Sequence, residues 1–153
     1  MGQNKALLLY QGFPMVEHMT ELLCQAGCND VYISGEVPGY DGIPDAVRHD
    51  GPACAMAGLL ASSKDRYERI LFVPVDMPLI QIKSLQRLLG QNNSVYYQGY
   101  NLPACIRTGK FDLSCSVREL LALAGAQALD LPPEEKSGKM NINTKKEWEE
   151  LAS

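Results

Sequence analysis

Residues 69–75, with the sequence RILFVPV, form an apolar run of strand length that stops abruptly at Asp76, Met77 and Pro78. Such a run is typical of a strand buried on both faces, as in the parallel sheets of α/β proteins. Because a proline has no N–H to give to a sheet, the strand is predicted to end at this point. We therefore expect the carboxylate of Asp76 to lie at the carboxyl end of a buried strand.

Helical and strand patterns alternate on both sides of this run. Apolar residues at helical spacing begin at Met15 and stop at Gly27, a residue that commonly ends helices, whereas the turn chemistry of Gly51 and Pro52 opens a second helix. The elements predicted along the chain are helices over 15–26, 53–63 and 82–89, strands over 31–34, 46–49 and 69–75, a long loop over 35–45, and an antiparallel strand pair over 94–98 and 102–106. Capping boxes over 116–119 and 144–147 mark two further helix starts.

This alternation predicts an α/β fold with a mostly parallel sheet, in which ligands bind beyond the carboxyl ends of the strands. The chain has 153 residues, which suits one domain over 1–153 with a single core. Its net charge of -4 disfavours nucleic acid as a partner, and no apolar run is long enough to span a membrane. The five cysteines are irregularly spaced, as expected of thiols in a reducing cytoplasm.

Several short stretches resemble one family when they are taken together. Residues 1–8 (MGQNKALL) are similar to the tail of the nucleotidyltransferase signature, which runs leucine-alanine-glycine-glycine, a few residues, arginine-methionine-glycine, lysine and an apolar run. The stretches ISG at 33–35, DGP at 50–52, VPVDMP at 73–78, LPA at 102–104 and NINT at 141–144 follow in the order and spacing of the molybdenum cofactor guanylyltransferases. This resemblance covers nearly the whole chain and implies a three-layer Rossmann-like nucleotidyltransferase fold.

The resemblance implies transfer of GMP from GTP to molybdopterin with Mg²⁺. It makes Asp76 the metal-binding carboxylate and a catalytic residue, while the cap of a turn before Met77 and Pro78 is its ordinary structural role. It makes Lys5 a catalytic residue that contacts the triphosphate, whereas the residue type alone would favour a solvated surface lysine.

The remaining candidate residues follow from the same resemblance. Asp50, Gly51 and Pro52 are expected to bind the nucleotide, although Asp50 also suits the N-cap of the following helix. Asn141 and Asn143 resemble asparagines on the pterin side of the family's cleft, and they are equally ordinary residues for a turn.

One feature departs from the family pattern. The sequence begins at the methionine inside the signature, so we expect the usual first strand and its glycine-rich turn to be absent, which leaves catalytic activity open. The alternatives are a related cytidylyltransferase or sugar nucleotidyltransferase, and a non-catalytic fragment of the same fold that binds a partner. The resemblance also implies molybdenum enzymes or other proteins of the cofactor pathway as protein partners.

Overall fold

The computed structural model describes residues 4–44, 51–112, 116–139 and 141–152. The predicted strand over 46–49 and the candidate residue Asp50 lie outside these residues. The chain divides into two compact units. The first comprises the described residues of Met1–Ile43, Pro74–Gln86 and Pro132–Ser153, and the second those of Pro44–Val73 and Arg87–Leu131.

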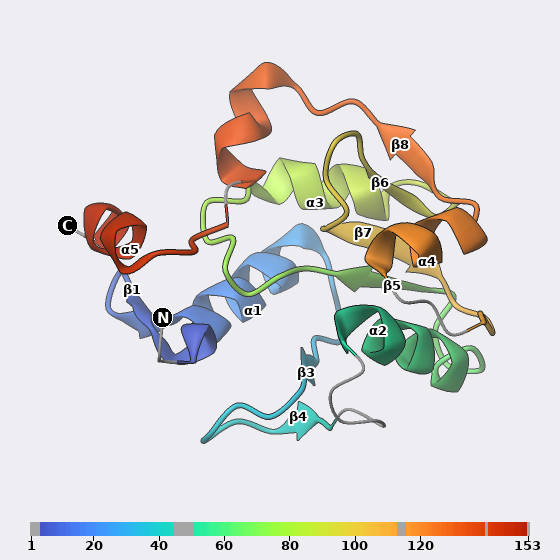
Figure 1. The fold of residues 1–153 in the computed structure, drawn as a ribbon, viewed down its shortest axis with the longest axis horizontal. Coiled ribbons are helices and arrows are strands. Elements are labelled where there is room, and N and C mark those ends of the chain that lie inside the picture. Colours follow the sequence, from blue (N-terminus) through green and yellow to red (C-terminus); the bar gives the residue numbers. More distant parts are fainter. Residues whose placement is uncertain (1–3, 45–50, 113–115, 140, 153) are drawn as a thin grey trace. The chain divides into compact units, whose positions relative to one another are not determined.

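The first unit contains short strands and helices from both ends of the chain. Its elements are the 3₁₀ helix η1 (Lys5–Leu7), β1 (Leu9–Tyr10), β2 (Phe13–Pro14), α1 (Met15–Ala26), β3 (Ile33–Ser34), β4 (Gly42–Ile43), the 3₁₀ helix η2 (Pro133–Lys139) and α5 (Lys145–Ala152). The helix α3 (Ile82–Leu89) begins in this unit and ends in the second. Figure 1 shows these elements in their order along the chain.

The first helix is confirmed with the predicted bounds. The side chains of Met15, Val16 and Met19 are buried on one face of α1, as the helical spacing of apolar residues requires. The helix ends at Gly27, whose left-handed backbone with φ of 111° is unfavourable for residues other than glycine. Its N–H donates to the carbonyl of Cys24 at 3.1 Å.

Two short strand pairs of this unit were not predicted from the sequence. The predicted loop over 35–45 includes β4, which pairs in parallel with β3, and Gly35 donates its N–H to the carbonyl of Ile43 at 2.8 Å. After η1, the strand β1 pairs with β2 in an antiparallel hairpin that turns at Gln11 and Gly12. These ladders are two residues long, too short to leave an alternating pattern in the sequence.

The second unit is built on a four-stranded sheet with the order β5-β7-β6-β8. Its strands are β5 (Arg69–Phe72), β6 (Val95–Tyr97), β7 (Ala104–Arg107) and β8 (Gln127–Leu129), and its helices are α2 (Gly51–Ser62) and α4 (Val117–Leu123). The strands β5 and β6 both run antiparallel to β7, as predicted for the β6–β7 pair, whereas β6 and β8 are parallel. The α/β fold class is confirmed, with a sheet of mixed direction.

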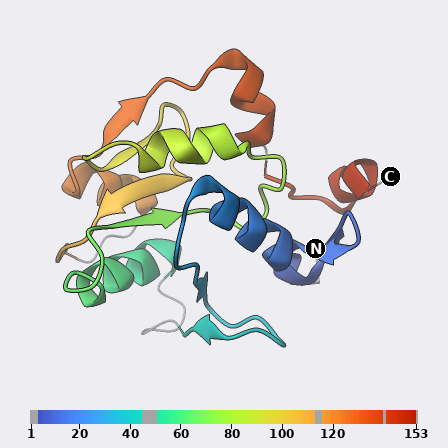
Figure 2. The same ribbon diagram turned by 180° about the vertical axis from the view of Figure 1, so that it is seen from behind.

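Helices cover both faces of this sheet. Ala104 and Ile106 of β7 pack on one face with residues of α2 and α4, which lie near each other in Figure 1. Cys105 points to the opposite face, because successive strand residues alternate, and it packs there with Leu88 at the end of α3. Figure 2 shows the strands of this sheet from behind. Helical residues thus pack on both faces of the sheet, from α2 and α4 on one face and from the end of α3 on the other.

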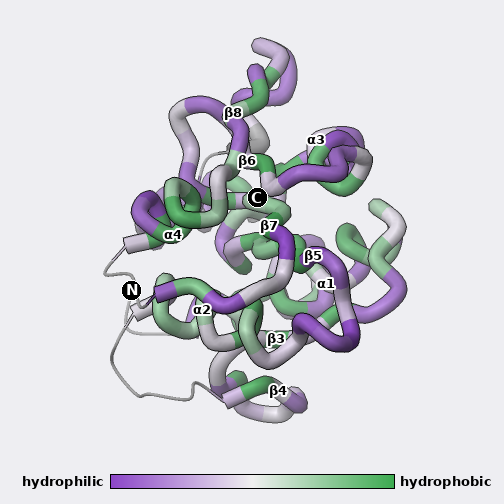
Figure 3. Tube along the Cα trace, turned by 90° about the vertical axis from the view of Figure 1, so that its right-hand side faces the viewer, coloured by the Kyte–Doolittle hydropathy of each residue, from purple (hydrophilic) through white to green (hydrophobic). Residues whose placement is uncertain are grey.

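The helix α3 has the predicted bounds and is strongly amphipathic. Figure 3 shows hydrophobic and hydrophilic residues alternating along its trace. Leu85 and Leu88 have no exposed surface, while Lys83 and Gln86 are exposed. The helix ends before Gly90, as its sequence predicts.

The strand that was expected to deliver Asp76 ends earlier than predicted. The ladder of β5 stops at Phe72, and Asp76 lies in a turn four residues further along the chain. Pro74 explains the early end, because its missing N–H and fixed φ do not suit a continued ladder. The side chain of Asp76 is therefore positioned by contacts around this turn and not by a strand end.

No helix among the described residues is long and apolar enough to cross a membrane.

We predict opposite effects on stability from two glycine-to-alanine substitutions. In Gly42→Ala the new Cβ would overlap the backbone carbonyl of Gly35, and the free energy of unfolding should fall by about 1–3 kcal/mol. Gly58 lies inside α2 with open space around it, so that Gly58→Ala should stabilise the protein by about 0.5–1 kcal/mol. Thermal unfolding of both variants measures the difference, and a stabilising Gly42→Ala would contradict the β3–β4 pairing.

Candidate functional site

Lys5, Asp76 and Asn143 meet in the first unit although they come from distant parts of the chain. The ammonium nitrogen of Lys5 donates to Oδ2 of Asp76 at 2.9 Å and to Oδ1 of Asn143 at 3.2 Å. The side chain of Lys5 is 32% exposed and that of Asp76 is 15% exposed. The contact is thus a partly desolvated ion pair with an amide beside it.

Asn141 holds the other oxygen of the same carboxylate. Its side-chain nitrogen donates to Oδ1 of Asp76 at 2.9 Å, and the backbone N–H of Ile142 donates to the carbonyl of Asp76 at 2.9 Å. Both carboxylate oxygens and the backbone carbonyl of Asp76 therefore accept hydrogen bonds. These bonds fix the direction of the carboxylate.

Local structure explains why Lys5 and Asp76 lie where they do. Lys5 begins η1, whose first turn is capped by the side chain of Asn4 accepting from the N–H of Ala6 at 3.1 Å. The turn that contains Asp76 continues into Pro78, whose carbonyl accepts from Nε2 of His18 on α1 at 3.0 Å. Each end of the ion pair is thus attached to an element with its own hydrogen bonds.

The predicted capping box at 144–147 is confirmed, and it reaches the site. Thr144 Oγ1 accepts from the N–H of Glu147 at 3.1 Å, while Oε2 of Glu147 accepts from the N–H groups of Thr144 and Asn143, each at 2.9 Å. In a capping box the glutamate side chain accepts from the N–H of the cap residue, which is Thr144 here. The bond from the N–H of Asn143 is additional to this motif. The additional bond holds the backbone of Asn143, whose side chain contacts Lys5.

These hydrogen bonds lower the pKa of Glu147. The largest cause is the backbone N–H of Asn143, followed by the backbone and side chain of Thr144, and the positive charge of Lys5 acts in the same direction. Each of these groups favours the charged carboxylate. The cap is therefore expected to be in place at neutral pH.

The donor set suits a hard cation. Asp76 offers carboxylate oxygens, and the side chains of Asn141 and Asn143 offer amide oxygens, which are the atoms that Mg²⁺ prefers. Among the described residues no group of three or more His, Cys, Asp and Glu side chains is placed to hold a metal ion. The residues present thus fit a cation that takes few ligands from the protein and completes its shell with phosphate oxygens and water. They do not fit a site in which the protein supplies every ligand.

Not every predicted site residue joins this cluster. Asn141, Asn143, Lys5 and Asp76 are brought together, whereas Gly51 and Pro52 are the first, exposed residues of α2 in the second unit. Their nucleotide-binding role, with that of Asp50, stays a prediction.

Two further residues of the first unit were not singled out by any sequence motif. His18 on α1 is half-buried and packs edge-on against Tyr10 with ring centroids 4.6 Å apart. Glu135 lies in a stretch rich in charged residues, and it is 2% exposed and accepts from the hydroxyl of Ser84 at 2.6 Å. Both depend on partners distant in sequence, which no local pattern reveals.

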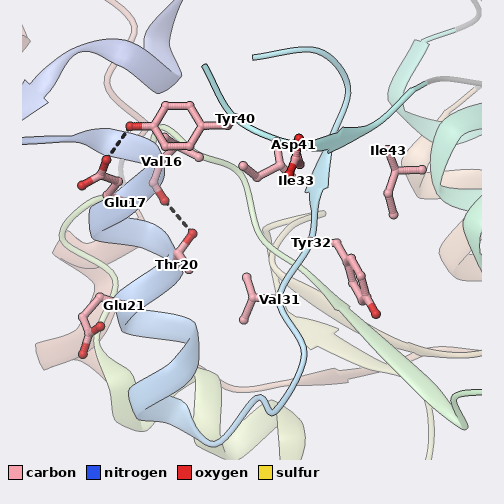
Figure 4. Close-up of a pocket in the computed structure, with 10 residues that line it drawn as sticks. All are labelled: Val16, Glu17, Thr20, Glu21, Val31, Tyr32, Ile33, Tyr40, Asp41 and Ile43. Carbon is pink, nitrogen blue, oxygen red and sulfur yellow. Dashed lines mark hydrogen bonds between the residues drawn. The ribbon is translucent and has the colours of Figure 1, made fainter. Parts of the chain in front are cut away.

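A separate hollow of about 460 Å³ lies between α1 and the segment of β3 and β4. Figure 4 shows its apolar side chains, among them Val16, Val31 and Ile33, and the hydrogen bond that Tyr40 donates to Glu17 at 2.5 Å. Its lining includes none of the predicted site residues. The hollow is therefore distinct from the cluster around Asp76.

Comparison with known proteins places the chain in the class of nucleoside triphosphate transferases. The MobA-like NTP transferase domain family matches residues 1–129, and the chain belongs to this family. It is also similar to a molybdenum cofactor guanylyltransferase from Xanthomonas euvesicatoria pv. vesicatoria (strain 85-10), with 35% identity over 170 residues that cover 99% of this chain and 87% of the relative. The resemblance found in the sequence motifs is thus confirmed at the level of the family.

We predict that the Glu147 cap weakens in acid. A carboxyl whose pKa is lowered by folding stabilises the protein above its unfolded value of 4.5, and this contribution is lost as the pH falls through the lower folded value. The stability advantage of the wild type over Glu147→Gln should therefore be constant near pH 7 and shrink below pH 4.5. Thermal unfolding from pH 7 to pH 3 measures it, with the amide resonances of Asn143 and Thr144 as a local probe. Amide resonances that do not respond to this titration would contradict the cap.

Proposed function

We propose that this protein transfers GMP from GTP to the terminal phosphate of molybdopterin. In this reaction an oxygen of the acceptor phosphate forms a bond to the α-phosphorus of GTP, the bond from that phosphorus to the bridging oxygen breaks, and pyrophosphate leaves. Membership of the NTP transferase family and similarity to a protein named as a molybdenum cofactor guanylyltransferase support the proposal. The observation that carries it is the contact of Lys5, Asp76 and Asn141 in one cluster.

Lys5 is the group proposed to contact the triphosphate. Its ammonium has three donors on a flexible stem, and such a point charge follows negative charge as it moves between phosphate oxygens. The ammonium donates to Asp76 and Asn143, and it is about one third exposed, at 32%. A triphosphate oxygen is a stronger acceptor than the amide of Asn143, so GTP is expected to draw Lys5 away from that amide.

Asp76 is the residue proposed to hold Mg²⁺. The bound cation would supply positive charge to oxygens of the triphosphate that are crowded with negative charge. Asn141 keeps the carboxylate oriented, because its side chain donates to Oδ1. The protein contributes one oriented carboxylate, and substrate phosphates and water complete the shell in this proposal.

The two asparagines are proposed to face the molybdopterin acceptor. An amide both donates and accepts hydrogen bonds, which suits a pterin with alternating donors and acceptors. Asn141 and Asn143 are exposed, although part of each amide is already bonded within the cluster. Asp50, Gly51 and Pro52 are proposed to contact the nucleoside.

In this function residues 1–153 act as one nucleotidyltransferase domain, which we place in the cytoplasm. The family match over 1–129 includes residues of both compact units, which supports a single domain. The excess of acidic residues, with a net charge of -4, supports small-molecule substrates and proteins as partners, without nucleic acid or a membrane.

Calorimetric titration of GTP in the presence and absence of Mg²⁺ tests the proposal. The wild type should bind GTP more tightly with Mg²⁺, and it should prefer GTP to CTP. Asp76→Asn keeps the shape of the side chain and loses its charge. The increase in GTP affinity that Mg²⁺ provides, called the gain from Mg²⁺ below, should therefore fall by at least about tenfold.

Asp65→Asn is the matched control, because Asp65 is exposed in the second unit and its loss should leave the gain from Mg²⁺ unchanged. Tighter binding of CTP would favour the cytidylyltransferase alternative. Failure of both nucleotides to bind would favour a non-catalytic binding protein and overturn the proposed activity.

A further inference from the structure

In the part of the chain that the structure describes, Glu135 is a buried carboxylate that the proposed reaction does not use. The side chain of Glu135 in η2 is 1% exposed. Burying a charge is costly unless it is paired and hydrogen-bonded, so glutamate is rare in such positions. Its presence calls for a structural or functional reason.

Two side chains in the first turn of α3 contact the carboxylate of Glu135. The hydroxyl of Ser84, itself on a residue that is 1% exposed, donates to Oε2 of Glu135 at 2.6 Å. The ammonium of Lys83 lies 3.7 Å from Oε1, and the side chain of Gln81 donates to the carbonyl of Glu134 at 3.2 Å. A carboxylate is also favoured near the N-terminus of a helix by the helix dipole.

The same two chain segments meet a second time at the candidate site. Asp76 lies eight residues before Ser84, and Asn141 lies six residues after Glu135. Asn141 and Ile142 donate to Asp76 at 2.9 Å each. The segments are thus joined at two places within the first unit, one buried and one in the site.

The buried contact limits how far the exposed one can move. Asn141 is exposed and its single amide bond to Asp76 is weak by itself, since a hydrogen bond in water contributes about 0.5–1.5 kcal/mol net. A short chain fixed at Glu135 keeps Asn141 near Asp76 and reduces the entropy that this bond must overcome.

We propose that Glu135 is a positioning residue, which by its bond to Ser84 holds Asn141 against Asp76 and so orients the carboxylate for the metal-bound nucleotide. This inference rests on the proposed function. Glu135 itself touches no reacting group; it acts through η2 and Asn141. A buried ion pair is often no more stabilising than apolar residues of the same size, and a positioning role gives a reason for its presence.

Two substitutions break the buried contact, and one keeps it. Ser84→Ala removes the hydroxyl donor with the loss of a single atom, and Glu135→Leu removes the acceptor. Both should reduce the gain in GTP affinity that Mg²⁺ provides by about tenfold, in the range seen when groups that orient a metal ligand are lost. Glu135→Gln still accepts from Ser84 and should stay within about threefold of the wild type, because the pair with the exposed ammonium of Lys83 is weak.

A stability control separates positioning from folding. Leu121→Ala in α4 empties part of the core of the second unit and should lower the melting temperature without changing the gain from Mg²⁺. All titrations are made well below the lowest melting temperature. If Glu135→Leu does not fold, Ser84→Ala decides the question, because it removes a single atom and leaves the pair of Glu135 with Lys83 in place.

The outcomes of the inference and of the proposed function are distinguishable. A wild type that gains nothing from Mg²⁺ in GTP binding overturns the proposed function. A wild type that gains from Mg²⁺, with Ser84→Ala and Leu121→Ala both unchanged in that gain, overturns the positioning role alone. Loss in Ser84→Ala with retention in Glu135→Gln and Leu121→Ala supports it.

Discussion

The contact between the ammonium of Lys5 and the carboxylate of Asp76 is the interaction on which the candidate site depends. It joins residues 71 positions apart at 2.9 Å, and each partner has at least one further polar contact, to Asn143 or Asn141. An ion pair in water is worth little, with typical values of about 0–1 kcal/mol. Its importance here is geometric: it brings a cation, a carboxylate and two amides to one place.

That contact also has a chemical consequence. The carboxylate oxygen of Asp76 that accepts from Lys5 is the kind of ligand that binds a divalent cation. The ammonium of Lys5 is the kind of group that binds a triphosphate. Substrate and metal would therefore separate the pair together, each compensating one of its charges. In this proposal the ion pair keeps the two charged groups close together before the substrate binds, and Asn141, positioned by Glu135, keeps the carboxylate oriented when Lys5 moves away.

Local patterns in the sequence predicted the parts of the fold that are decided locally. The helices at Met15–Ala26 and Ile82–Leu89, the pair of β6 and β7, and the caps at Ser116 and Thr144 follow from apolar spacing and turn residues. Local patterns did not predict the elements that depend on tertiary pairing. These are the early end of β5, the two-residue ladders of β1 to β4, and the strand β8.

The candidate site divides in the same way. Family motifs singled out Lys5, Asp76, Asn141 and Asn143, and the structure brings these four together. No motif singled out Glu135, because a glutamate beside Glu134 and Lys136 resembles a solvated charge until its burial against Ser84 is known. Residues proposed to contact substrate are found in family motifs, whereas a residue that acts through its buried contacts is not recognisable from the sequence.

The most direct test of the central claim is a paramagnetic one: GTP with substoichiometric Mn²⁺ is added to labelled protein, and the side-chain amide of Asn141 is followed by NMR. If Asp76 holds the cation beside Asn141, this resonance broadens strongly in the wild type and recovers in Asp76→Asn. Equal broadening in both proteins, or none in the wild type at saturating GTP, would contradict the account.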